Sequence, residues 1–242
     1  MKQIRQTLAR QFAMDYHCAP EDFADTRTLV TAYAPHAGAR HREEAGLLSI
    51  LTFGGKLVMT AAPELVPWCE QTLAKRLSAP WCFEADSLVA IDRKLEELGY
   101  TIDQVHLFFV PEGPVPEPAL PVKLLDRAEI APLQSDGRID EAFLFSDDVP
   151  DMLGAAVFDR SGKLLAVAGA SANSALLWEM GVNSFSEGRG CAQAALRALT
   201  RAVLQQGKVP YYGTAMSHLA SQRVALGAGL TPVFAELTTK KR

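Results

Sequence analysis

A glycine-rich segment, residues 183–192, contains the residues of this sequence that are best suited to chemistry. It follows an apolar run typical of a strand, and it leads into an amphipathic run typical of a helix, residues 190–206. The first amides of a helix have no intrahelical acceptor and lie at the positive end of the helix dipole, so they attract anions. Gly188 and Gly190 allow the backbone to approach a ligand closely, and Arg189 adds a positive charge. The segment therefore predicts a phosphate or diphosphate site.

Two other anion-binding motifs fit this segment less well. A Walker-type loop requires G-x-x-x-x-G-K-[ST], which the sequence lacks. The dinucleotide fingerprint requires a third glycine, where this chain has Gln193, and an acidic residue about 20 positions later, which is absent. An ordinary strand-to-helix turn also contains glycines, so a purely structural role for residues 187–192 stays open as an alternative.

Residues 182–192 resemble the strand-and-loop signature V-x-P-x-x-[QR]-G-x-G-x-[GA] of the general N-acetyltransferase (GNAT) superfamily. Residues 218–230 are similar to a second pattern of that superfamily, N-x-x-S-x-x-x-Y-x-x-x-G-F. The resemblance covers about residues 126–237, and the first half looks like the extra domain of a bacterial two-domain subgroup. The chain departs from these patterns at Ser184 (usually Pro), Glu187 (Gln or Arg), His218 (Asn) and Ala225 (the Tyr that often protonates the departing thiolate).

The resemblance implies acetyl-coenzyme A (acetyl-CoA) as the cosubstrate, with its diphosphate on the backbone amides of the glycine segment. The residues implied to bind it are Met180, Gly181, Val182, Glu187, Gly188, Arg189, Gly190, Cys191 and Ala192. An attacking amine must lose a proton, and Glu179 is the acidic residue on the preceding strand that could accept it. His218, Tyr211 and Tyr212 are candidate proton donors in place of the missing tyrosine. A solvated Glu179 and a surface His218 stay open as alternatives.

Hydrophobic periodicity and turn residues predict the elements that position these residues. In the second half we expect strands at 152–158, 163–168, 175–182, 209–213 and 231–237, and helices at 190–206 and 217–226. In the first half we expect helices at 3–16, 66–77 and 87–98, and strands at 46–53, 56–60 and 105–110. The polar side of the helix at 190–206 should carry Gln193, Arg197, Thr200 and Arg201. The element order of the second half agrees with the GNAT resemblance.

The clearest predicted boundary is a proline-rich segment, residues 111–121, in which five of eleven residues are proline. Proline lacks a backbone donor and favours an extended path, so neither a helix nor a central strand should pass through it. We therefore predict an N-terminal α/β domain at residues 1–110, a linker, and a C-terminal domain at residues 122–242. The expected fold class is α+β, with a GNAT-like mixed sheet flanked by helices after the smaller N-terminal α/β domain.

Composition limits the classes of protein to which the chain can belong. Of its 242 residues 48% are hydrophobic, which excludes a largely disordered protein. A net charge of −4 argues against nucleic acid as the main partner, and no run of about 20 apolar residues is present to cross a membrane. The four cysteines show no C-x-x-C pair and no metal-type spacing with the five histidines. We expect no metal site and a reducing compartment, the cytoplasm.

The function that these features favour is acetyl-CoA-dependent transfer of an acetyl group to an amine by direct attack on the thioester. The acceptor could be a small molecule or a protein, and a homodimer is a further arrangement open to the chain. The departures at Glu187 and Ala225 motivate an alternative, an acyl-CoA-binding regulatory protein or inactive relative. A structural protein without a ligand site is the third hypothesis.

Overall fold

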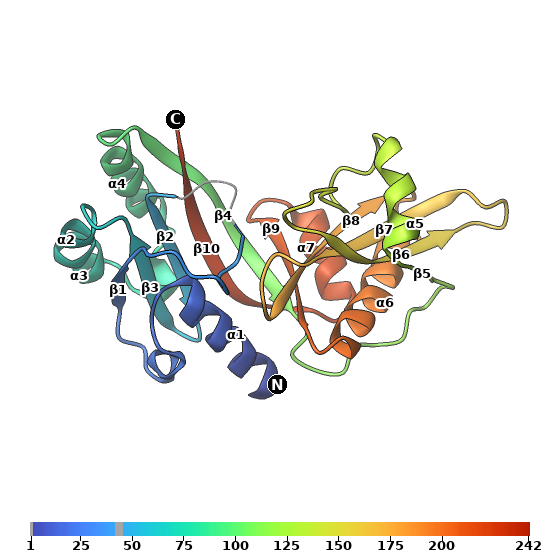
Figure 1. Ribbon diagram of the computed structural model, residues 1–242, viewed down its shortest axis with the longest axis horizontal. Coiled ribbons are helices and arrows are strands. Elements are labelled where there is room, and N and C mark those ends of the chain that lie inside the picture. Colours follow the sequence, from blue (N-terminus) through green and yellow to red (C-terminus); the bar gives the residue numbers. More distant parts are fainter. Residues whose placement is uncertain (1, 42–45) are drawn as a thin grey trace. The chain divides into compact units, whose positions relative to one another are not determined.

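The computed structural model of the chain describes residues 2–41 and 46–242. Internal contacts divide the chain into two compact units, which are described separately below (Figure 1). Unit 1 contains residues 2–8, 109–214 and 218–232, and unit 2 contains residues 9–108, 215–217 and 233–242. The residues predicted to carry the chemistry all lie in unit 1.

Unit 1 is built on a mixed sheet with the strand order β9-β8-β7-β6-β5. The strands are β5 (Lys123–Leu125), β6 (Asp151–Phe158), β7 (Leu164–Ser171), β8 (Leu177–Ser184) and β9 (Val209–Ala215). Neighbours are antiparallel except β8 and β9, which are parallel. The hairpin between β6 and β7 turns at Gly162, whose φ is +86°, while the Asp159 carboxylate accepts hydrogen bonds from nearby turn amides. The predicted hairpin and the mixed sheet are confirmed.

Helix α6 (Cys191–Gln205) packs against β6, β7 and β8. Its buried side chains, Leu196, Leu199 and Val203 among them, recur at helical spacing as predicted. The prediction that Thr200 lies on the polar side was wrong. Thr200 is fully buried, because its hydroxyl donates to the carbonyl oxygen of Leu196 and so needs no water. The other helices of the unit are α5 (Arg127–Ile130), η4 (Ala131–Ser135) and α7 (Leu219–Gly227).

The proline-rich segment lies along α6 and forms no helix or strand. Arg201 donates to the carbonyl oxygen of Val115 and forms an ion pair with Glu117, and Arg197 donates to the carbonyl oxygen of Glu117. The extended path predicted from its prolines is therefore present. Pro111 and Val115 are buried, while six of the eleven residues of the segment are exposed. Carbonyl groups of the segment that have no partner strand accept hydrogen bonds from the arginines of α6 instead.

The strands that run through unit 2 follow the order β1-β3-β2-β10-β4. They are β1 (Leu29–Ala32), β2 (Leu48–Phe53), β3 (Lys56–Ala61), β4 (Tyr100–Val110) and β10 (Thr231–Lys241). A core that includes Ile50, Met59 and Ile91 packs these strands against α4 (Ala85–Glu96). The remaining helical elements are α1 (Lys2–Asp15), η1 (Pro20–Ala24), α2 (Val66–Trp68), the π-helical η2 (Cys69–Leu73), α3 (Ala74–Arg76) and η3 (Ala79–Trp81).

The division into units differs from the predicted domain boundaries at the C-terminal strand. We assigned residues 122–242 to one domain, but β10 pairs antiparallel with β2, in the register Phe234↔Phe53 to Leu237↔Ile50. Residues 233–242 therefore belong to unit 2. The periodicity of a segment indicates that it forms a strand, but it does not indicate which strand is its partner. The sequence therefore predicted the residue range of β10 but not its neighbours in the sheet.

Candidate functional site

The parallel strands β8 and β9 separate partway along their length. Their pairing runs from Leu177↔Val209 to Met180↔Tyr212, whereas β8 continues to Ser184 and β9 to Ala215. On its other side β8 stays paired with β7 as far as Ser184. Beyond Met180 the edge of β8 that faced β9 therefore offers backbone groups to which an extended ligand could hydrogen-bond as an added strand. Val182 lies on this part of β8.

The bend that follows β8 exposes its backbone at the start of α6. Gly188 and Gly190 have φ of +69° and +71°, and no atom lies within 4 Å of a Cβ built on either. Residues 187–190 are exposed, and the first turn of α6 contains no acidic residue. Helix geometry leaves the first amides of α6 without an intrahelical acceptor, so this bend has the open backbone that a diphosphate requires.

The side chains predicted to bind acetyl-CoA therefore differ in accessibility. Those of Glu187 and Arg189 are exposed, so the glutamate places a negative charge and the arginine a positive charge beside the bend. Cys191 and Ala192 are buried, which leaves their amides as the groups available to a ligand. Cys191 is 2% exposed, so its side chain packs inside the unit.

Alternate residues of β8 face opposite sides of the sheet. Met180 is buried, and its sulfur lies 3.6 Å from the hydroxyl oxygen of Thr200 in α6. Gly181 faces the other way, where a Cβ would lie 1.7 Å from the carbonyl oxygen of Glu141. Met180 can thus contribute only backbone groups, and Gly181 is explained by close packing against the chain at Glu141.

The segment that covers Gly181, residues 140–143, is held by a strand side chain that we did not single out. The Asn183 side-chain oxygen accepts bonds from the amides of Glu141 and Ala142, and its nitrogen donates to the Asp140 carboxylate. The same segment lies across Gly169, where a Cβ would be 1.9 Å from the carbonyl oxygen of Ala142.

The glycines under this segment form a row across the sheet. Gly154, Gly169 and Gly181 are partners in adjacent strands. In the sequence, each of three consecutive strands contains one glycine. That these glycines are neighbours can be recognised only when the strand register is known. The row lets residues 140–143 form one wall beside the point where β8 and β9 separate.

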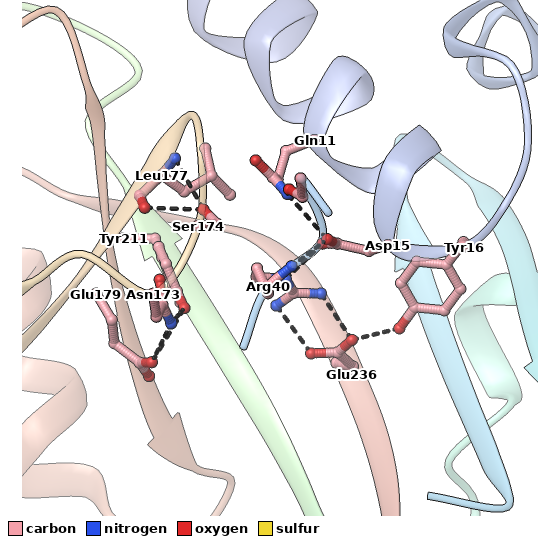
Figure 2. Close-up of polar contacts among 11 residues, drawn as sticks. Gln11, Asp15, Tyr16, Arg40, Asn173, Ser174, Leu177, Glu179, Tyr211 and Glu236 are labelled. Carbon is pink, nitrogen blue, oxygen red and sulfur yellow. Dashed lines mark hydrogen bonds and ion pairs between the residues drawn. The ribbon is translucent and has the colours of Figure 1, made fainter. Parts of the chain in front are cut away.

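Glu179 lies one residue before the last β8–β9 pair and belongs to a hydrogen-bonded cluster with Tyr211 and Asn173 (Figure 2). Its Oε2 accepts bonds from Asn173 Nδ2 at 2.8 Å and from the Tyr211 hydroxyl at 3.0 Å. Asn173 Nδ2 also donates to the Tyr211 hydroxyl oxygen. Both partners are buried, and Asn173 Oδ1 has no hydrogen-bond partner within the described part of the chain. Glu179 is half-buried, and its carboxylate is held by two buried side chains.

The two other candidate proton donors lie in different environments. The Tyr212 hydroxyl is buried at the last β8–β9 pair and is 2.7 Å from the Ser221 hydroxyl. Burial raises the pKa of Tyr212, and the negative charge of Glu141 raises it further. His218 is exposed immediately before α7, and its side chain does not cap that helix. The geometry therefore favours Tyr212 over His218 as a buried group that keeps its proton.

Thr214, two residues after Tyr212, is a further polar group near the strand separation. It is buried, and its hydroxyl has no hydrogen-bond partner in the residues that the structure describes. A buried hydroxyl without a partner is costly, so Thr214 fits a ligand that supplies hydrogen-bonding groups. We did not predict it, and a threonine in a strand gives no signal by itself.

Residues 2–41 and 46–242 contain no group of three or more His, Cys, Asp or Glu side chains that could hold a metal ion. Over the same residues, none of the helices is both long and apolar enough to cross a membrane.

No protein-family model matches the chain, and no curated protein matches it. Among solved structures, it is similar to a GCN5-related N-acetyltransferase-like protein from Streptococcus suis, with 17% identity, full coverage of both chains and a TM-score of 0.48. It is similar to a GCN5-related N-acetyltransferase from Sphaerobacter thermophilus, with 13% identity, 100% of this chain and 93% of that chain covered, and a TM-score of 0.48. A third, a GCN5-related N-acetyltransferase from Kribbella flavida, has 19% identity, 84% and 89% coverage and a TM-score of 0.45.

Proposed function

We propose that unit 1 is an acetyl-CoA-dependent N-acetyltransferase of the GNAT type, which moves an acetyl group to an amine by direct attack on the thioester. One observation carries the proposal: β8 and β9 stop pairing at Met180↔Tyr212, beside a bend with two positive-φ glycines that opens onto α6. An extended arm ending in a diphosphate fits this combination, because a strand edge and a helix start lie on one continuous stretch of chain.

The binding roles follow from the groups that remain accessible. The amides of residues 188–192 would bind the diphosphate, and the edge of β8 around Val182 would bind the pantetheine arm. Thr214 would supply a hydrogen bond from the facing strand. Arg189 would add a charge-assisted contact, whereas Glu187 weakens anion binding unless its carboxylate points away.

The proton-transfer roles belong to the groups at the last β8–β9 pairs. As the amine nitrogen attacks the thioester carbonyl carbon, the carbon–sulfur bond breaks and the amine proton passes to Glu179, directly or through water. Asn173 and Tyr211 hold the Glu179 carboxylate in one orientation through the bonds to Oε2. Tyr212 would donate its proton to the departing thiolate, since the buried phenol is protonated at neutral pH, and its phenolate would regain a proton from Glu179 through water.

Two measurements test this function. Calorimetric titration with acetyl-CoA should give saturable binding, and the bound ligand should raise the melting temperature by an amount that grows with the logarithm of 1 + [acetyl-CoA]/Kd. Release of free thiol from acetyl-CoA should then accelerate when a suitable amine from a broad panel is added. An absence of binding at millimolar acetyl-CoA would refute the proposal.

The alternative function, an acyl-CoA-binding regulator without activity, is favoured by Ala225. This fully buried residue stands where the resemblance places a catalytic tyrosine. It predicts tight binding of acetyl-CoA and no amine-dependent thiol release with any acceptor. Release well above the rate of hydrolysis with any single amine would eliminate it.

A further inference from the structure

Unit 2 contains a cavity that plays no part in the acyl-transfer proposal. Its volume is about 560 Å³, which is the size of a small-molecule site. Its lining includes Asp15, Arg40, Ser49 and Thr60, together with the rings of Tyr33 and three histidines. All of these residues belong to unit 2. The cavity is therefore built by one unit, independently of the residues around Glu179.

The floor of the cavity holds a buried hydroxyl that the fold leaves unsatisfied. Thr60 is 3% exposed, and its hydroxyl has no hydrogen-bond partner in residues 2–41 and 46–242. Its neighbour across the β2–β3 pair is Ser49, so two hydroxyl side chains lie opposite each other on one face of the strands. Leaving a buried polar atom without a partner is costly, and a ligand in the cavity would remove that cost.

Asp15, Arg40 and Glu236 form a buried ion network, which Figure 2 shows. Asp15 and Arg40 of this network line the cavity together with Thr60. The guanidinium of Arg40 contacts Asp15 at 2.5 Å and Glu236 at 2.8 Å, and all three side chains are almost completely buried. Tyr16 donates a further hydrogen bond to Glu236. The two carboxylates and one guanidinium carry two negative charges and one positive charge. Their field in the adjoining cavity is therefore that of a negative group, which attracts a cation.

The wall of the cavity adds an aromatic surface. The rings of His17 and Tyr33 meet edge to face, with centroids 5.5 Å apart, and Tyr33 is 43% exposed at the rim. The face of an aromatic ring attracts an organic ammonium group more strongly than it attracts a neutral ligand. A cation with a short carbon chain could thus contact Tyr33 and the Thr60 hydroxyl oxygen together.

We propose that this cavity is a binding site for a small organic cation, a protonated primary or secondary amine. The Thr60 hydroxyl oxygen accepts a hydrogen bond from the ammonium group, the Asp15–Arg40–Glu236 network supplies the attractive field, and Tyr33 covers the alkyl chain. None of these residues has a role in the acetyl-CoA proposal, so this inference stands whether or not unit 1 transfers acetyl groups.

The test uses the full chain at pH 8, with one positively charged and one negatively charged small molecule as probes. 1,4-Diaminobutane should bind in calorimetry and raise the melting temperature, whereas succinate, which has the same number of carbons, should not. Thr60→Val keeps the shape of the side chain but removes the hydroxyl, so it should raise the Kd for the diamine about fivefold, the value of one hydrogen bond. The unliganded variant should be at least as stable as the wild type, because it loses a buried unsatisfied group.

Thr214→Val is the matched control, since Thr214 is also a buried strand threonine whose hydroxyl has no partner within the described residues. It lies in unit 1 and should leave diamine binding unchanged. Tyr33→Ala, at an exposed rim position that does not threaten folding, should also weaken the diamine, and Tyr33→Phe should restore its affinity. Failure of the diamine to bind, preferential binding of succinate, or equal loss in both threonine variants would each overturn the proposal.

Discussion

Replacing Gly190 with aspartate should weaken acetyl-CoA binding at least tenfold. Gly190 directly precedes α6, so the new carboxylate would lie beside the diphosphate. Two unit charges about 5 Å apart repel by about 0.8 kcal/mol in bulk water and about 3 kcal/mol at an effective dielectric constant of 20. A diphosphate carries two negative charges, so the loss is about 1.7 kcal/mol at the lower bound, which exceeds a tenfold change in Kd.

Gly207 provides a control with the same backbone conformation and the same open surroundings at the other end of α6. Both glycines have φ of +71°, and neither has an atom within 4 Å of an added Cβ. Asp at either position adopts the same left-handed backbone, which costs about 1 kcal/mol and which Asp tolerates better than most residues. The 15 residues of α6 separate the two positions by about 22 Å, more than two Debye lengths at physiological ionic strength. Gly207→Asp should therefore leave Kd unchanged.

Both variants and Gly190→Asn should be titrated with acetyl-CoA in a calorimeter. Comparison of the aspartate and asparagine variants separates the effect of the added charge from the effect of the added side-chain volume. The asparagine variant should bind more tightly than the aspartate variant, and added salt should reduce the difference between them. Wild-type affinity in a folded Gly190→Asp protein would refute the placement of the diphosphate at this bend. An equal loss in Gly207→Asp would show that backbone strain, and not charge, is responsible.

Three further outcomes are expected. Glu179→Gln should lower kcat at least 100-fold in the thiol-release assay with the Kd for acetyl-CoA unchanged, because a general base contributes about 10²–10⁴; a normal kcat would eliminate this role. Thr214→Val should raise the Kd for acetyl-CoA several-fold without lowering the melting temperature, and unchanged affinity would exclude its contact with the ligand. Burial raises the pKa of Cys69 and of Cys82 from 9.0 to about 12, so these thiols stay protonated in the folded protein while the unfolded chain ionises. Stability should therefore fall as the pH rises above about 9, as chemical denaturation at several pH values would reveal, and both thiols should resist alkylation at pH 8 until the protein unfolds.

Local sequence determined most of the elements of this fold. The helix predicted at 190–206 is α6 (Cys191–Gln205), and the hairpin predicted at 152–168 is formed by β6 and β7. Short elements such as β1, β5 and α5 were not predicted, because segments of three or four residues are too short to show a period. The C-terminal strand, β10, was predicted as a strand but was assigned to the C-terminal domain. Its pairing with β2 depends on residues that are far away in the sequence.

The candidate site also combines features that the local sequence determined with features that only the tertiary structure decided. By itself the sequence determined the glycine bend at Gly188 and Gly190, because positive φ and an open approach depend on the missing side chain of the residue itself. Only the tertiary structure decided that Glu179 bonds Tyr211, a contact between residues 32 positions apart that exists because parallel strands bring them opposite each other. It also decided that β8 and β9 separate after Met180. Where two strands stop pairing is set by strand register and by what packs on both faces, and neither is a property of a short stretch of sequence.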